Sequence, residues 1–178
     1  MPSRIFKIFL ILSIALLAVF LQFSFISPLP VFFRAINLPL AFLLIILIFF
    51  SSSEALIVSF FFGFIFDSWY FSPFGTYLLS FLGIVLFAQI VLNNWLTNRS
   101  LYSFLVLTII SSFFYNIVWS SFNFIFSLGG EGGRFFLFSW DFIKNLFFSA
   151  LWLVLICGLS FVVLSQISHR LKPVFLKR

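Results

Sequence analysis

Ten consecutive apolar residues occupy Ala41–Phe50, which reads AFLLIILIFF. A second largely apolar stretch, Leu151–Leu164, reads LWLVLICGLSFVVL. Lipid cannot hydrogen-bond backbone N–H and C=O groups, so segments that cross a bilayer are helices or the strands of a closed barrel. Barrel strands alternate polar and apolar side chains, and neither stretch alternates. We therefore predict an all-α fold whose helices cross a membrane.

Composition agrees with this class. Of the 178 residues, 63% are hydrophobic and only 8% are charged, whereas about a quarter of the residues in a soluble domain are charged. The net charge of +6 comes from ten Lys and Arg against four Asp and Glu. These basic residues lie mainly at the ends of apolar runs, where they set topology. The chain is thus expected to lie in a lipid bilayer and to have no nucleic-acid partner.

The apolar runs predict a single integral membrane domain, residues 1–178, with six spans in a polytopic helical bundle. The predicted spans cover residues 5–26, 38–50, 55–70, 75–93, 101–128 and 140–168. The first run is longer than the apolar region of a signal peptide, and no A-x-A site follows it, so we expect an uncleaved span. The second and third spans are short for a hydrocarbon core of about 30 Å. Whether they cross completely is left open.

The distribution of charge predicts the orientation. With six spans, both termini lie on one side of the membrane. That side collects seven basic residues: Arg4, Lys7, Arg99, Arg170, Lys172, Lys177 and Arg178. The opposite side has three: Arg34, Arg134 and Lys144. Because basic residues favour the cytoplasmic side, both termini are expected in the cytoplasm.

Asp67 is the only acidic residue near the interior of an apolar run. A carboxylate at membrane depth is costly, so it is expected to have a partner or a function. Small residues line one face of each neighbouring span: Ser59, Gly63 and Asp67 on the third, Thr76, Ser80 and Gly83 on the fourth. Small faces let helices approach closely. We predict a tight hairpin with Asp67 near its apex and a turn shaped by Pro73 and Gly75.

Polar residues also recur on one face of the fifth span, at Ser112, Asn116, Trp119 and Asn123. The stripe predicts either a docking surface for a partner helix or hydrogen bonds between this protein's own helices. Asp141 and Lys144 lie one turn apart at the start of the sixth span and are expected to pair.

Reactive side chains are few: one His, one Cys and four carboxylates. Cys157 lies alone in a span, which excludes an intramolecular disulfide and a cysteine metal site. A paired-aspartate membrane protease needs two facing Asp residues, but Asp141 lies at a span end and no G-x-G-D motif surrounds it or Asp67. We predict no catalytic residues, no cofactor and no metal site.

The segment Gly63-Phe64-Ile65-Phe66-Asp67, five residues, then Pro73-Phe74-Gly75 forms a G-x-x-x-D, x5, P-x-G pattern. This pattern resembles the signature of the MreD family of bacterial rod-shape-determining membrane proteins. Asn37-Leu38-Pro39, before the second span, is similar to the proline-marked entry in that family. The chain length, the six predicted spans and the basic ends resemble the family as well.

The resemblance implies a non-enzymatic scaffold of the lateral cell-wall elongation (peptidoglycan synthesis) machinery in the bacterial cytoplasmic membrane. Implied partners are an MreC-like protein with one membrane span, an actin-like cytoskeletal filament and cell-wall synthases. Gly63 and Asp67 would be structural or partner-binding residues. The full set of helix-packing and partner candidates is Ser59, Gly63, Asp67, Pro73, Gly75, Ser80, Gly83, Ser112, Asn116 and Asn123.

The alternative function is the substrate-binding membrane subunit of a vitamin transporter of the energy-coupling factor type, which also has six spans. The first span of such subunits usually carries an A-x-x-x-A face, whereas Ala15 and Ala18 here are three residues apart. The predicted extracytoplasmic loops also offer few polar groups for a ligand.

Overall fold

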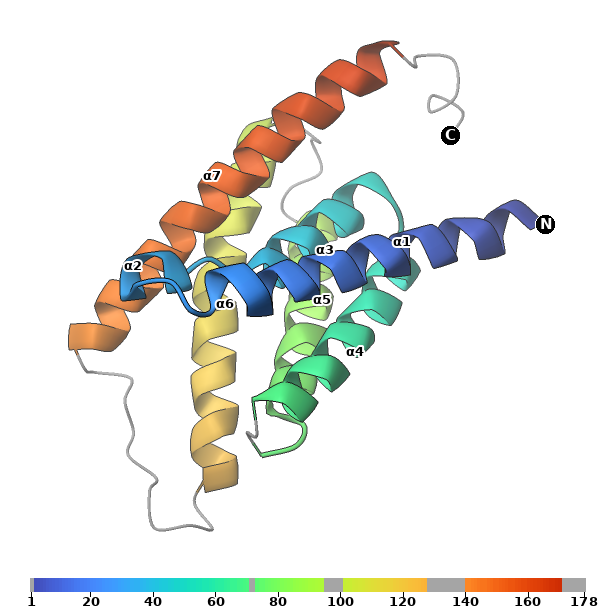
Figure 1. Ribbon diagram of the computed structural model, residues 1–178. Coiled ribbons are helices and arrows are strands. Elements are labelled where there is room, and N and C mark those ends of the chain that lie inside the picture. The colour runs from blue at the N-terminus through green and yellow to red at the C-terminus, as the bar shows by residue number, and fades with distance from the viewer. Residues whose placement is uncertain (1, 71–72, 95–100, 128–139, 171–178) are drawn as a thin grey trace.

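The computed structural model describes residues 2–70, 73–94, 101–127 and 140–170 (Figure 1). The side chains of Arg4, Asp141, His169 and Arg170 lie outside this described part, as do residues 99, 134 and 172–178. The Asp141–Lys144 pair and most of the charge distribution used for orientation therefore stay predictions.

Helices make up most of the described residues, and no strand occurs among them, which confirms the all-α class. Along the chain they are α1 (Pro2–Leu21), its π-helical continuation η1 (Gln22–Ile26), α2 (Val31–Arg34), α3 (Leu38–Phe49), α4 (Ser52–Trp69), α5 (Thr76–Asn94), α6 (Leu101–Ser127) and α7 (Trp140–Arg170). Five helical stretches of the described chain are long and apolar enough to cross a membrane: Phe6–Ile26, Phe32–Phe49, Thr76–Asn94, Leu101–Ile125 and Phe142–Val163. The chain is thus a polytopic membrane protein.

Helix α4 differs from its predicted span in where it begins. The Oγ of Ser51 accepts a hydrogen bond from Glu54 N at 3.4 Å and caps the helix, as serine commonly does. Residues 52–54, expected in a connection, therefore belong to α4. With 18 residues, α4 is about 27 Å long, but Glu54 and Asp67 lower its apolar character and it is not among the five stretches.

The short helix α3 is sheltered by its neighbours. It has 12 residues, about 18 Å, and its Leu43 and Ile46 are fully buried. The break before it is closed by Gln22, whose Nε2 donates to Ile36 O at 2.9 Å and whose Oε1 accepts from Leu38 N at 3.1 Å. Asn37 Oδ1 accepts from Leu40 N at 3.1 Å. Side chains thus satisfy backbone groups that lipid could not.

Consecutive helices from α4 to α7 pack as neighbours, and α3 packs against α1, α4, α5 and α7. The core between them is filled by large apolar side chains such as Phe62, Phe81, Phe104 and Leu107. Large apolar side chains also cover the outer surface of α1, for example Phe9 at 69% exposed. Such an apolar surface is favourable in contact with lipid and unfavourable in contact with water.

The helix ends define two sides of the bundle. In Figure 1, α2 and the N-terminal end of α7 lie at the left, and the C-terminal ends of α4 and α6 and the N-terminal end of α5 lie toward the bottom. The N-terminal end of α1 and the C-terminal end of α7 lie toward the upper right. We call the first group of ends the α2 side of the bundle.

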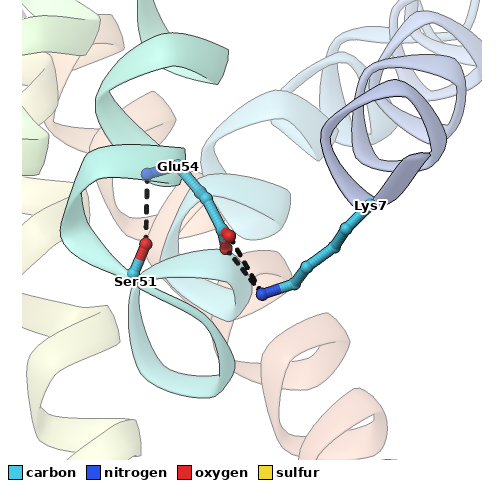
Figure 2. Close-up of polar contacts among 3 residues, drawn as sticks. All are labelled: Lys7, Ser51 and Glu54. Carbon is cyan, nitrogen blue, oxygen red and sulfur yellow. Dashed lines mark hydrogen bonds and ion pairs between the residues drawn. The ribbon is translucent and has the colours of Figure 1, made fainter. Parts of the chain in front are cut away.

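An ion pair joins α1 to α4 at the other side, as Figure 2 shows. Lys7 Nζ lies 2.9 Å from Glu54 Oε1 and 3.2 Å from Oε2, so both carboxylate oxygens accept from it. The Lys7 ammonium also lies 4.8 Å from the centre of the Phe50 ring. Glu54 is near the N-terminus of α4, where a negative charge is favourable. The pair therefore links α1 to the first turn of α4.

Candidate functional site

The carboxylate of Asp67 caps helix α5. Asp67 lies near the end of α4 and is only 3% exposed. Its Oδ2 accepts from Gly75 N at 2.9 Å and from Leu78 N at 3.1 Å, and its Oδ1 accepts from Tyr77 N at 2.8 Å. The first N–H groups of a helix have no partner within it and carry the positive end of its dipole. The buried charge is therefore compensated by the helix that follows.

The connection between α4 and α5 depends on Gly75 and Pro73. Gly75 has a φ of 103°, a conformation that glycine adopts at no steric cost, and this orients its N–H toward Asp67. The Pro73 carbonyl accepts from Thr76 N at 3.2 Å and from Thr76 Oγ1 at 2.8 Å. Two residues of the P-x-G motif thus shape the start of α5.

Gly63 lets α4 and α5 approach at their backbones. A Cβ atom built on Gly63 would lie 2.9 Å from both the N and the Cβ of Leu78, and closer still to its Cα. Real Cβ atoms do not approach backbone so closely, so only glycine fits while the helices hold this distance. The structure therefore contains the tight hairpin that the sequence predicts. Gly63 and Asp67, on consecutive turns of α4, hold it together.

The small-residue face predicted on α5 is wrong in part. Gly83 faces α6, where a built Cβ would meet only Val118 Cγ1, at 4.0 Å. The residue that packs onto Gly63 is Leu78, which has a large side chain. Close approach here needs a missing side chain on one helix only, because the backbone of the other fills the space.

The two predicted serines of the hairpin do not join its helices by hydrogen bonds. Ser59 and Ser80 are both fully buried. Ser59 Oγ donates to Leu56 O at 2.8 Å and Ser80 Oγ donates to Thr76 O at 2.6 Å, each within its own helix. They act as small residues whose hydroxyls are satisfied locally.

The stripe on α6 divides into two parts. Ser112 Oγ lies 3.1 Å from Ser149 Oγ of α7, and Asn116 Nδ2 donates to Ser149 Oγ at 3.0 Å and to Ser112 O at 2.8 Å. These contacts bind α6 to α7 within the protein. Trp119 turns toward α5, with its ring 6.0 Å from that of Tyr77. Asn123 is half-buried, nearer the end of α6.

A cavity of about 370 Å³ opens among the helices on the α2 side of the bundle. One wall is polar. Its side chains come from α2, the α2–α3 junction, α6 and α7: Arg34, Asn37, Asn116, Asn145 and Ser149. Gln22 and Leu40 close the wall next to Asn37.

The opposite wall of the cavity is aromatic. It is lined by Phe66, Tyr70, Tyr77, Tyr115 and Trp119. The Tyr70 and Tyr77 rings are stacked, with centroids 5.5 Å apart and an interplanar angle of 26°. The cavity adjoins the hairpin, because Phe66 and Tyr77 lie in the same turns as the Asp67 cap.

The sequence alone did not predict this cavity. The predicted loops contain few polar groups for a ligand, whereas the cavity takes polar side chains from within the helices. Of the predicted site residues only Asn116 lines it, and Arg34, Trp119 and Tyr70 were assigned other roles or none. One feature of the sequence could have indicated the cavity. Polar residues within the spans, such as Ser149 and Asn145, fall near helix ends that lie on the α2 side of the bundle.

Gly63 and Asp67, which carry the resemblance to a known signature, lie together in the hairpin, and the cavity lies beside them. No family model, curated protein or solved structure matches this chain.

Proposed function

We propose that this protein is a non-enzymatic membrane scaffold of the bacterial lateral cell-wall elongation complex, resembling the MreD family. The observation that carries the proposal is the role of each motif residue in the α4–α5 hairpin. Gly63 admits the Leu78 backbone, Asp67 caps α5, and Gly75 supplies the positive φ that the cap needs. The G-x-x-x-D, x5, P-x-G pattern therefore specifies one rigid structural unit.

A structural role for Asp67 favours a scaffold over an aspartate protease. Both of its oxygens accept backbone hydrogen bonds, with Gly75, Tyr77 and Leu78 as donors. A general acid or base must be free to exchange a proton with a substrate. A carboxylate whose acceptor positions are filled by a helix N-terminus is poorly suited to that task.

The proposal includes the cytoplasmic membrane as the location, with both termini in the cytoplasm. It places the Lys7–Glu54 pair at the cytoplasmic face and the α2 side of the bundle, with Arg34, at the extracytoplasmic face. An MreC-like partner with a single span would then meet the apolar outer surface of the bundle within the bilayer and extend from the α2 side. The actin-like filament would act at the opposite face.

Affinity purification from native membranes tests the proposal. The tagged full chain is extracted in mild detergent and its partners are identified by mass spectrometry. Recovery of a single-span coiled-coil protein or of cell-wall synthases is expected. Recovery of ATPases together with a coupling membrane subunit would instead indicate the vitamin-transporter function.

Two variants make the purification specific for the hairpin. Gly63→Ala places a methyl group against the Leu78 backbone, whereas Gly83→Ala places one in open space near Val118. The scaffold proposal expects partner recovery to fall in Gly63→Ala and to stay at the wild-type level in Gly83→Ala. Equal partner recovery in both variants would show that close packing of the hairpin is not required for partner binding.

A further inference from the structure

We propose that the cavity on the α2 side of the bundle binds a small monoanionic molecule that carries a flat ring. Its volume of about 370 Å³ falls within the range of about 300 to 1,000 Å³ that is usual for small-molecule sites. The inference does not rest on the scaffold function, because a structural protein and a transporter subunit can both hold a ligand.

The charge of the lining selects an anion. Arg34 is the one charged residue among the lining side chains that the structure describes, and no carboxylate of the described residues lines the cavity. Among the residues that the structure describes, Arg34 forms no ion pair, and Asp67 is engaged by the N-terminus of α5. A guanidinium group without an acidic partner binds a carboxylate through two parallel hydrogen bonds. One cation matches one negative charge.

One neutral polar group points to a further acceptor on the ligand. Asn37 is not that group, because its Oδ1 accepts from Leu40 N and its side chain is also hydrogen-bonded to Tyr115. The Trp119 Nε1 is buried with no hydrogen-bond partner in the described part of the chain. A buried donor without an acceptor is costly, and Trp119 lines the cavity, so an acceptor on a bound ligand would satisfy it.

The aromatic wall selects a ring. Tyr77 stacks with Tyr70, and the centre of the Trp119 ring lies 6.0 Å from that of Tyr77. Flat rings gain from offset stacking against such surfaces beyond the burial of their area. An anionic group next to Arg34 and a ring against Tyr70 would span the cavity from its polar wall to its aromatic wall.

Native mass spectrometry of the purified full chain tests the proposal. We expect wild-type protein from native membranes to carry a molecule of a few hundred daltons that is detected as an anion after release. Arg34→Gln should lose it. Lys144→Gln is the matched control, because Lys144 is an exposed cation on the same side of the bundle that does not line the cavity. Asn145→Leu, which narrows the cavity, is a second variant and should also lose the molecule.

Thermal unfolding with defined probes separates charge from ring. The probes are 4-hydroxybenzoate, its neutral counterpart 4-hydroxybenzamide, and inorganic phosphate. At about ten times its dissociation constant, 4-hydroxybenzoate should raise the wild-type midpoint by roughly 3 to 5 °C, with no rise in Arg34→Gln. The amide and phosphate should have smaller effects.

Three results would overturn the proposal. One is a bound mass that matches a phospholipid, which would assign the cavity to an anionic headgroup. Another is retention of the bound anion in both Arg34→Gln and Asn145→Leu. The third is the absence of a bound molecule together with equal midpoints in benzoate and benzamide. None of these results bears on the partners recovered in the purification described above, so the two proposals fail separately.

Discussion

Asp67 Oδ2 lies 2.9 Å from Gly75 N, so a carboxylate at the end of one membrane helix caps the start of the next. The contact explains how a charged residue is accommodated in an apolar run. Tyr77 and Leu78 complete the cap with two further N–H groups. The cost of burying the charge is offset by hydrogen bonds to backbone groups that would otherwise lack partners at membrane depth.

Replacing Asp67 by Asn should weaken the hairpin. The amide keeps one acceptor oxygen but directs an NH2 group toward backbone N–H donors. We expect a loss of about 1 to 3 kcal/mol in unfolding free energy, measured by thermal or denaturant unfolding in detergent. Ser68→Ala is the neighbouring control, because the Ser68 hydroxyl bonds only to Phe64 O of its own helix. Equal stability of the two variants would rule out the cap as a stabilising contact.

Adding a methyl group at Gly63 should separate α4 from α5. Overpacking a well-packed interface typically costs about 1 to 3 kcal/mol, and here the obstacle is the Leu78 backbone rather than a flexible side chain. Gly63→Ala should therefore lower the unfolding midpoint in detergent. Gly83→Ala, whose new methyl would have its nearest neighbour at 4.0 Å, should leave it unchanged or raise it slightly. The reverse order of the two midpoints would contradict the observed packing.

The Lys7–Glu54 pair predicts a charge-reversal experiment. Glu54 is largely sheltered, with its side chain 12% exposed, whereas the Lys7 side chain is 45% exposed. Lys7→Glu should reduce stability by about 1 kcal/mol, since two like charges would face each other. The double variant Lys7→Glu, Glu54→Lys should recover part of the loss; full recovery is not expected because α4 favours an acidic residue in its first turn. A double variant no more stable than Lys7→Glu would show that the pair does not contribute.

Single-cysteine labelling tests the orientation. Cys157 is fully buried and can be replaced by Ser to give a cysteine-free background. In that background, Arg34→Cys should react with a membrane-impermeant thiol reagent applied outside intact cells. Ser53→Cys, exposed at the opposite side of the bundle, should react only after permeabilisation. The opposite pattern would place the termini outside the cytoplasm.

Much of the fold could be predicted from the sequence because lipid restricts the choice. Uninterrupted apolar runs specify helices, and their lengths locate α5, α6 and α7 to within about two residues of the predicted spans. The start of α4 was missed because Ser51 acts as a cap, and a serine-rich segment is equally typical of a loop. The small residues around Gly63 correctly indicated the close approach, since that signal is local.

The cavity could not be predicted because its lining is assembled from six separate segments. Arg34, Asn145 and Tyr70 are far apart along the chain, and each has an ordinary role at a membrane interface when considered alone. The packing of α2 against α7, and of α3 against α4 and α7, brings them to one cavity. The stripe on α6 was ambiguous for the same reason: Asn116 faces Ser149, and no pattern in α6 itself identifies that partner.

The most direct test of the central claim is controlled depletion of this protein in its native host, with cell shape and the pattern of new wall insertion imaged as the protein is lost. The scaffold account predicts that cells lose their elongated shape and insert wall material diffusely, and that Gly83→Ala restores elongation while Gly63→Ala does not. Normal shape after depletion, with growth restored by supplying a vitamin in the medium, would contradict the account and favour the transporter function.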